Sequence, residues 1–424
     1  MTNIRTEALA VLNRCESAEQ YSNIAIDTAL SRSSFSAADR GLFTALVYGV
    51  IERRLTLDYR IGRLSSRPVE EIDLSTRNLL RMGIYQLAFM DRIPDHAAVN
   101  ETVALATKRT KGFVNAVLRS FLRDGKKIPF PDAAKDPVGY LSVRYSFLPA
   151  LCERFLSAFG FERTESLFSA FCKQPPLTLR TNTLRTSRDG LIARLQAEGY
   201  DASPALEGAA GIRLPSAPVT ALPGFDTGDF FVQDEASQLC VKALDARQGM
   251  RVLDVCACPG SKSFGAAIDM QNAGEVISCD LHKNKLSLVE RGAKRLGISI
   301  LSTQARDARS PNPDWIGTFD RVLCDVPCSG FGVFAKKPEL RYKDPTASNT
   351  LPDIQLAILQ NASTYLKSGG LLVYSTCTLL PEENGQNVAR FLASHPDFSL
   401  LSDRTLTPDL DGTDGFYFAV LKKE

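Results

Sequence analysis

Four apolar segments in the C-terminal half of the chain end in acidic, hydroxyl or thiol side chains. In chain order these side chains are Asp254 and Cys256, then Asp280, then Asp325 and Cys328, and finally Thr376 and Cys377. A packed core needs no such residue at every strand end, whereas a thiolate can attack an electrophile and a carboxylate can bind a ribose hydroxyl. The spacing therefore indicates a catalytic site that combines a nucleophile with a bound cofactor.

The first of these segments leads from a strand, through a turn of small residues, into a helix that begins near Lys262. Such a turn lets the backbone approach a ligand, and the free N–H groups of a helix start suit a carboxylate. The turn has neither the Gly-x-Gly-x-x-Gly pattern nor a Walker A loop. Asp280 ends the strand that follows Asp254, close to the spacing at which an acidic residue binds a ribose. The turn alone is compatible with a structural role; together with Asp280 it favours an adenosine-containing cofactor.

The two thiol segments are Asp325-Val-Pro-Cys-Ser-Gly330 and Tyr374-Ser-Thr-Cys-Thr378. Each cysteine alone could be an ordinary core residue at the end of a strand. Two thiols at the ends of neighbouring strands, beside a pocket that contains Asp and Lys, favour nucleophilic chemistry. Lys262 could lower a thiol pKa, polarise a substrate ring, or form a simple salt bridge.

These residues require a mostly parallel sheet with helices on both faces, because short apolar strands alternate with amphipathic helices. Ligands of such sheets bind beyond the carboxyl ends of the strands. We predict strands at 251–255, 275–279, 319–324 and 371–375, and helices at 263–270, 283–296 and 353–366.

The residues before this predicted sheet form two other kinds of structure. The first part of the chain, up to residue 125, is predicted to be all-helical, with Asp39 and Asp73 as N-caps, one helix that stops near Gly112, and a last helix at 113–123. Gly125 and the prolines at 129, 131 and 137 predict a linker. A small α+β subdomain follows, with helices at 149–172 and 191–198 and strands at 177–180 and 211–214.

The composition indicates the class of protein and the number of domains. The 424 residues are 44% hydrophobic and 23% charged. These values are expected for a globular chain of two to four domains. There is no apolar run of membrane-span length and no signal-peptide pattern at the start, so we expect a cytoplasmic protein with reduced thiols.

Two further features of the composition bear on ligands. The chain has no Cys-x-x-Cys pair and only three dispersed His, so we expect no metal. Residues 1–128 hold 19 Lys+Arg against 14 Asp+Glu. This basic excess suggests either a polyanionic partner or solvated helix faces.

Several segments resemble the Sun/Fmu-type RNA cytosine-C5 methyltransferases. Residues 254–262 are similar to that family's cofactor loop, and the Pro-Cys and Thr-Cys segments are similar to its two cysteine motifs. Phe231-Val-Gln-Asp-Glu-Ala-Ser-Gln238 and Asp414-Gly-Phe-Tyr-Phe418 also match. Near the N-terminus, His96-Ala-Ala-Val-Asn-Glu-Thr-Val103 and Gly112-Phe-Val-Asn-Ala-Val-Leu-Arg119 resemble a NusB-like RNA-binding domain. This combination is typical of the ribosomal small-subunit methyltransferase B branch.

The resemblance implies three domains: a NusB-like all-α domain over 1–128, a small α+β subdomain over 138–235, and an α/β Rossmann-like methyltransferase domain over 236–424. It implies S-adenosylmethionine-dependent methylation of C5 of a cytosine in 16S rRNA, on free rRNA or on a small-subunit assembly intermediate. We expect a monomer that does not associate with membranes.

By the same resemblance Cys377 is the nucleophile, Asp325 contacts the base, Cys328 assists product release, and Lys262 supports the chemistry. The implied S-adenosylmethionine site consists of Cys256, Ala257, Cys258, Pro259, Gly260, Ser261, Lys262, Asp280, Asp307 and Asp325. Cys258 and Ser261 depart from the family pattern, and a serine adds a Cβ where the loop approaches the cofactor.

The other cysteines and one basic stretch complete the expectations. The remaining six cysteines are assigned to packing: Cys15, Cys152, Cys172, Cys240, Cys279 and Cys324. Residues 336–341 lack the histidine often found there and keep only a basic character, so we expect them to contact RNA phosphates or to form a solvated loop.

Two other functions remain open at this point. A different RNA or DNA cytosine-C5 methyltransferase is one; in the DNA class the Pro-Cys cysteine, here Cys328, would be the nucleophile. A non-catalytic NusB-like RNA-binding factor is the other.

Overall fold

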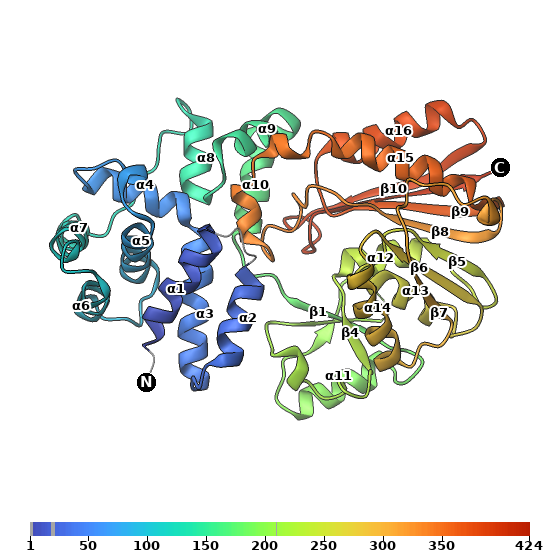
Figure 1. Ribbon diagram of the computed structural model, residues 1–424, viewed down its shortest axis with the longest axis horizontal. Coiled ribbons are helices and arrows are strands. Elements are labelled where there is room, and N and C mark those ends of the chain that lie inside the picture. Colours follow the sequence, from blue (N-terminus) through green and yellow to red (C-terminus); the bar gives the residue numbers. More distant parts are fainter. Residues whose placement is uncertain (1–2, 18–21, 209) are drawn as a thin grey trace. The chain divides into compact units, whose positions relative to one another are not determined.

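The computed structural model describes residues 3–17, 22–208 and 210–424, and the chain forms two compact units (Figure 1). Unit 1 consists of Met1–Cys172 and Phe334–Pro345, and unit 2 consists of Lys173–Val333 and Thr346–Glu424. The predicted fold class is confirmed: an all-helical N-terminal part, a small α+β part and an α/β part with a mostly parallel sheet. Among the described residues, no helix is long and apolar enough to span a membrane.

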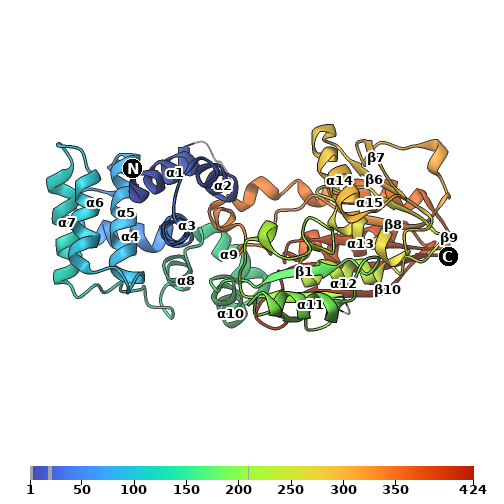
Figure 2. The same cartoon turned by 90° about the horizontal axis from the view of Figure 1, so that it is seen from below.

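Unit 1 is built from helices that pack around an apolar core (Figure 2). Phe43, Leu80, Leu118 and Phe121 are fully buried there. The helices are α1 (Ile4–Ser17), α2 (Ser22–Arg32), α3 (Ala37–Glu52), α4 (Arg54–Leu64), α5 (Leu74–Phe89), α6 (Asp95–Leu105), α7 (Lys111–Arg123), α8 (Pro137–Tyr145), α9 (Pro149–Phe159) and α10 (Phe161–Phe171), with a 3-10 turn η1 (Val69–Glu71).

Helix ends in unit 1 correct two predictions. Asp73 is the N-cap of α5 as predicted, but the cap of α3 is Ser36, whose hydroxyl accepts from the N–H of Asp39. α6 ends at Leu105, well before Gly112, and the Thr107 hydroxyl accepts from the N–H of Thr110 to form a turn between the two helices. Gly112 therefore lies in the first turn of α7.

Pro137 belongs to a helix and not to the predicted linker. It is the first residue of α8, a position where proline suits a helix because its missing N–H has no intrahelical partner. The carboxylate of Asp136 caps that helix by accepting from the N–H of Gly139 at 2.8 Å. The prolines at 129 and 131 lie outside helices and strands, but within unit 1, so they do not mark a boundary between the two compact units.

The basic stretch 336–341 lies within unit 1, where η4 (Pro338–Tyr342) is built into the helices. The Arg341 side chain is 2% exposed, and its guanidinium donates to the carbonyls of Glu52 at 2.9 Å and Phe171 at 2.8 Å. These carbonyls stand at the ends of α3 and α10, where helices leave acceptors unsatisfied. Arg341 is thus buried and cannot contact RNA phosphates, so the prediction is wrong for this residue; Lys336 and Lys337 are exposed.

The α+β part of unit 2 contains an antiparallel sheet in the order β2-β3-β1-β4. Leu179, Leu191, Ile212 and Phe230 form its core with α11 (Arg188–Ala197). The strands are β1 (Leu177–Thr181), β2 (Ser203–Pro204), β3 (Gly211–Leu214) and β4 (Phe230–Val232), and the 3-10 turn η2 (Val219–Ala221) follows β3.

A seven-stranded sheet in the order β10-β11-β9-β8-β5-β6-β7 forms the centre of unit 2. Strands β5 to β9 are parallel, and β11 is antiparallel to both β9 and β10. The bounds are β5 (Arg251–Asp254), β6 (Glu275–Asp280), β7 (Leu301–Ala305), β8 (Phe319–Asp325), β9 (Leu366–Thr376), β10 (Phe398–Leu406) and β11 (Phe416–Lys423). The four predicted strands are confirmed, whereas β7, β10 and β11 were not predicted.

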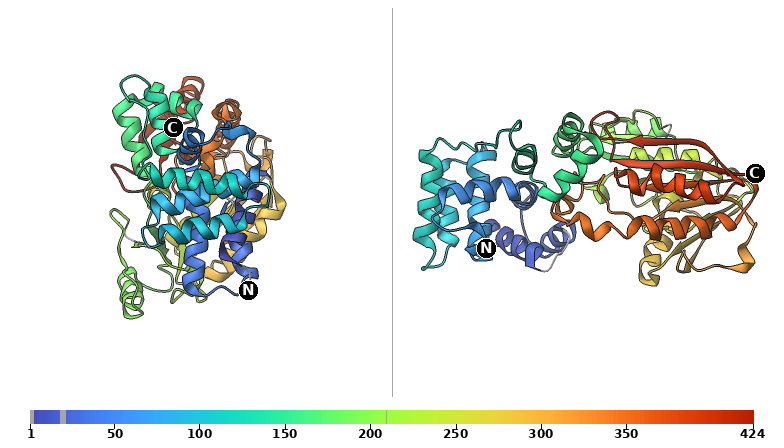
Figure 3. Two further views of the ribbon diagram at one scale, coloured as in Figure 1. Left: turned by 90° about the vertical axis from the view of Figure 1, so that its left-hand side faces the viewer. Right: turned by 90° about the horizontal axis from the view of Figure 1, so that it is seen from above.

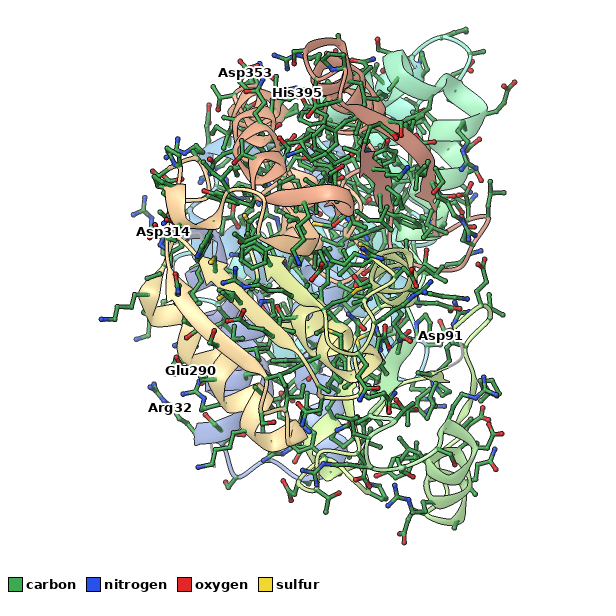
Figure 4. All side chains as sticks on the ribbon, turned by 90° about the vertical axis from the view of Figure 1, so that its right-hand side faces the viewer. Arg32, Asp91, Glu290, Asp314, Asp353 and His395 are labelled. Carbon is green, nitrogen blue, oxygen red and sulfur yellow. The ribbon has the colours of Figure 1, made fainter. Side chains whose placement is uncertain are left out.

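Helices cover both faces of this sheet (Figure 3). They are α12 (Glu235–Ala243), α13 (Ser261–Asp269), α14 (Lys283–Leu296), α15 (Leu351–Thr364) and α16 (Gly385–Ser394), and the 3-10 turns are η3 (Pro313–Trp315), η5 (Pro345–Ser348) and η6 (Pro381–Glu383). Figure 4 labels Asp353 at the start of α15, which pairs with Arg390 of α16 at 2.8 Å, and His395 just after α16. The strand order reverses between β5 and β8, and such a reversal is where parallel sheets of this kind bind ligands.

Substitution of Asp73 tests the cap of α5. The Asp73 carboxylate accepts from the N–H of Thr76 at 3.0 Å. Asp73→Ala should therefore lower the free energy of unfolding by about 1 kcal/mol. Asp91→Ala, at an exposed position just after the same helix, is the control. Urea unfolding followed by helical circular dichroism measures both variants, and an equal loss in the two would contradict the capping role.

Candidate active site

The turn after β5 brings a buried carboxylate next to the start of α13. Asp254 is 1% exposed; its Oδ2 accepts from the Ser263 hydroxyl at 2.6 Å, and Ser278 donates to that hydroxyl at 2.9 Å. Gly260 has φ +108°, and a Cβ there would lie 2.6 Å from the Phe264 ring, so this position requires glycine. Ser261 takes ordinary helical backbone as the first residue of α13, so the departure from the family pattern leaves the turn intact.

The two thiols of this turn are unsuited to nucleophilic attack. Burial raises the pKa of Cys256 well above its usual value, and burial raises the pKa of Cys258 to about 12. Both thiols therefore stay protonated at neutral pH.

Acidic residues follow the next two strands at the same edge of the sheet. Asp280 ends β6, and its Oδ1 accepts from the N–H of His282 at 2.9 Å. Asp307 lies just after β7 and pairs with Arg309 at 2.7 Å. The hydrogen bonds from the side chain and the backbone of Arg309 lower the pKa of Asp307. The sheet thus brings Asp254, Asp280 and Asp307 to the carboxyl ends of adjacent parallel strands.

An ion pair between buried Lys262 and half-buried Asp325 joins the turn to the end of β8. Lys262 Nζ lies 2.6 Å from Asp325 Oδ2, and Asp325 Oδ1 accepts from the Ser375 hydroxyl at 2.8 Å. Burial lowers the pKa of Lys262, but the Asp325 carboxylate and the thiols of Cys240 and Cys377 outweigh it, so the pKa is raised overall. Lys262 therefore carries a positive charge at neutral pH. It forms a salt bridge, which is one of the three roles left open by the sequence, and its charge also interacts with the Cys377 thiol.

Cys328 and Cys377, the two thiols of the Pro-Cys and Thr-Cys segments, lie close together. The Sγ atoms of Cys328 and Cys377 are 3.2 Å apart, and the N–H of Cys377 donates to Cys328 Sγ at 3.3 Å. Both thiols are half-buried. The hydrogen bond with Cys377, together with burial, raises the pKa of Cys328 well above its usual value.

The six cysteines assigned to packing are all at least half-buried. Cys152, Cys240, Cys279 and Cys324 are buried, and Cys15 and Cys172 are half-buried. Such burial is what a small apolar side chain in a core shows.

Three polar residues that sequence reasoning missed support the thiol-bearing loops: Gln355, Glu383 and Asn384. All three are buried. Asn384 accepts from the Thr376 hydroxyl at 2.5 Å and donates to the Thr378 carbonyl at 3.0 Å, so it binds on both sides of Cys377. The available signal was the polar run Pro-Glu-Glu-Asn shortly after the Thr-Cys segment, which reads as a solvated loop.

A glycine contact fixes the loop after Cys328. The N–H of Gly332 donates to the Cys377 carbonyl at 3.0 Å, and the N–H of Gly415 donates to the Gly332 carbonyl at 2.8 Å. A Cβ on Gly332 would lie 2.0 Å from the Gly415 carbonyl oxygen, so no larger residue fits there.

Three family descriptions match this chain. The description "16S rRNA methyltransferase RsmB/F" matches residues 241–422, the NusB family matches 2–123, and the ferredoxin-like domain of RsmF/B-like methyltransferases matches 150–220. The probable ribosomal RNA small subunit methyltransferase B of Bacillus subtilis is 36% identical over 446 aligned residues, which cover 100% of this chain and 99% of the relative. The chain belongs to the RsmB/F family of 16S rRNA methyltransferases.

Other RsmB/F relatives and solved structures agree. The ribosomal RNA small subunit methyltransferase B of Escherichia coli O139:H28 is 35% identical over 440 residues, covering 100% of this chain and 99% of that protein. The crystal structure of PH0851 superimposes with a TM-score of 0.82 at 25% identity, covering 100% and 99% of the two chains. A methyltransferase homolog from Pyrococcus horikoshii gives a TM-score of 0.60 at 27% identity and covers 67% of this chain and 98% of that one.

Asp254 should make stability depend on pH. Burial raises its pKa to about 7, although the Ser263 hydrogen bond acts in the opposite direction. In the unfolded chain an aspartate titrates near ~3.9. Between these values the folded state binds the extra proton, so the contribution to stability is greatest at acidic pH and falls as the pH rises towards 7. The loss from pH 5 to pH 8 should be about 3 kcal/mol.

Asp254→Asn should remove this loss, since an amide does not titrate. Thermal melts of wild type and variant at pH 5 and pH 8 measure the difference, and Asp353→Asn at an exposed position is the control. The same pH slope in wild type and Asp254→Asn would contradict the assignment.

Proposed function

We propose that this protein transfers a methyl group from S-adenosylmethionine to C5 of a cytosine in 16S rRNA, through a covalent bond between Cys377 and C6 of the base. The observation that carries the proposal is the pair of thiols 3.2 Å apart beside the Lys262–Asp325 ion pair. Membership of a 16S rRNA methyltransferase family supports the substrate class.

The reaction explains why a thiol is needed. Cytosine C5 is a poor nucleophile because methylation interrupts the aromatic ring. When the Cys377 thiolate adds to C6, a C–S bond forms and C5 becomes enamine-like, so C5 can take the methyl group as the donor's S–CH3 bond breaks. A base then removes the C5 proton, the C6–S bond breaks, and its electron pair returns to Cys377 as the aromatic ring is restored.

The charge of Lys262 supports Cys377 as the nucleophile. The family resemblance assigns Cys328 to product release. The Lys262 ammonium is electrostatically coupled to Cys377, and a nearby cation stabilises a thiolate.

Asp325 suits contact with the base. Ser375 and Lys262 orient its carboxylate from two sides. A fixed carboxylate can accept a hydrogen bond from the exocyclic amino group of cytosine, and a proton carried by the carboxyl group can be donated to N3, where negative charge develops. In this proposal Lys262 holds Asp325 in place.

The edge formed by β5 to β8 fits the proposed co-substrate, which supplies an activated methyl group. The glycine turn at residues 256–262 allows the cofactor to approach the backbone closely. In this proposal Asp280 binds the ribose, and Asp307 and Asp325 line the remainder of the cofactor site. We assign no metal to this reaction.

The basic excess of residues 1–128 and the match to the NusB family support RNA binding by unit 1. The substrate is then 16S rRNA, free or within a small-subunit assembly intermediate. We propose a cytoplasmic monomer with domains at 1–128, 138–235 and 236–424.

Removing the nucleophile tests the proposal directly. Cys377→Ala should lower methyl transfer to 16S rRNA by about 10³-fold or more, because the thiolate that adds to C6 is then absent. Cys15→Ala, which alters a half-buried thiol of unit 1, is the control and should keep activity. Tritiated methyl incorporation with mapping of the modified base measures both. Full transfer to a cytosine by Cys377→Ala would overturn the assignment, and activity lost only in Cys328→Ala would instead point to the Pro-Cys thiol.

Removing the release cysteine should trap the intermediate. Cys328→Ala should accumulate a covalent protein–RNA adduct, visible as a slow band on a denaturing gel. The double variant Cys328→Ala/Cys377→Ala should show no such band. A slow band that persists in the double variant would mean that the bond does not involve Cys377.

A further inference from the structure

Glu383 is a buried acid that the reaction outlined above does not use. It lies in η6 and is 0% exposed. Its Oε2 accepts two hydrogen bonds, from the backbone N–H of Ser329 at 2.9 Å and from Gln355 Nε2 at 2.8 Å. One of these donors is the residue that directly follows Cys328.

Gln355 connects the same carboxylate to the other side of Cys328. This residue of α15 is 0% exposed, and its Nε2 also donates to the Pro327 carbonyl at 3.0 Å. Pro327 and Ser329 are the two chain neighbours of Cys328, so Glu383 and Gln355 together hold the backbone on both sides of that thiol. The Ser329 hydroxyl further bonds Thr378 at 2.9 Å.

The turn that carries Glu383 is itself tied to the strand that leads to Cys377. The Tyr374 hydroxyl donates to the Glu383 carbonyl at 2.6 Å, and Asn384, the next residue, binds on both sides of Cys377. This one turn therefore contacts the backbone beside both Cys328 and Cys377.

Burying a carboxylate here has a cost. Among the described residues, Glu383 Oε1 has no hydrogen-bond partner. A buried oxygen without a partner costs about 1–3 kcal/mol. The hydrogen bonds that Oε2 accepts from Ser329 and Gln355 offset part of this cost and fix the backbone next to Cys328.

We propose that Glu383, with Gln355, is a positioning residue that holds Cys328 in the orientation needed to release the methylated RNA. This inference rests on the proposed function, in which Cys328 assists release. It assigns Glu383 no contact with the substrate and no proton transfer.

Glu383→Ala and Gln355→Ala should slow release more than they slow methyl transfer. Rapid-quench experiments measure methyl transfer in the first turnover, and denaturing gels measure the lifetime of the protein–RNA adduct. The ratio of adduct lifetime to transfer time should rise about tenfold or more, because small displacements of a reacting group carry penalties of that size. Glu383→Gln should restore the wild-type ratio, since its amide oxygen can accept from both donors.

Two comparisons separate positioning from general destabilisation. Gln360→Ala, on the same helix as Gln355, should leave the ratio unchanged. In the Cys328→Ala background, adding Glu383→Ala should not lengthen the adduct lifetime further, because the thiol that it positions is absent. Melting curves verify folding, and if Glu383→Ala does not fold, Gln355→Ala carries the test alone.

The outcomes are distinguishable. If the alanine variants slow both steps equally, or leave the adduct lifetime unchanged while Cys328→Ala still traps the adduct, the positioning role is wrong and the proposed function stands. If Cys328→Ala traps no adduct, both fall together.

Discussion

Parallel pairing between β8 and β9 is the constraint on which the candidate active site depends. In this register Asp325 lies opposite Ser375, and the Ser375 hydroxyl bonds the Asp325 carboxylate across the two strands. Cys377 directly follows β9 and Cys328 lies just after β8, so the register brings together two thiols that are far apart in the sequence. A slip of one residue would turn every side chain of a strand to the opposite face and separate them.

The remaining supports act on the loops beyond that pairing. Backbone bonds from Gly332 to Cys377 and from Gly415 to Gly332 link three segments without any side chain, and only glycines allow so close an approach. Three buried side chains form hydrogen bonds with the backbone next to the thiols: Glu383 and Gln355 beside Cys328, and Asn384 beside Cys377. Two half-buried thiols are thus held by fully buried polar partners, and the proposed catalysis requires such preorganisation.

The sequence predicts the strands that carry the chemistry because they are short apolar runs that end in functional residues. It does not predict β7 and β10, which lie at the two edges of the sheet. In β10 a bulge between Leu400 and Ser402 interrupts the alternation of apolar and polar residues that identifies a strand. The strand Phe416–Lys423 overlaps the motif Asp414–Phe418, and its continuous apolar run is itself a strand signal. The burial of Glu383 and Arg341 is not predictable from the sequence, because a charged residue in a polar run is usually solvated. Only the fold shows which partners surround each side chain.

The insertion of Phe334–Pro345 into unit 1 bears on how the protein is made. That unit is assembled from two stretches between which Lys173–Val333 intervenes, and Arg341 satisfies carbonyls at the ends of α3 and α10. During synthesis from the N-terminus, the helices emerge first but remain without their last segment until residue 345 has left the ribosome. By then β5, β6, β7 and β8 of the large sheet have also emerged from the ribosome, whereas β9, β10 and β11 have not. Unit 1 is therefore completed late during synthesis. Because it is made of two separate stretches of sequence, neither unit can be transferred to another protein as one contiguous segment.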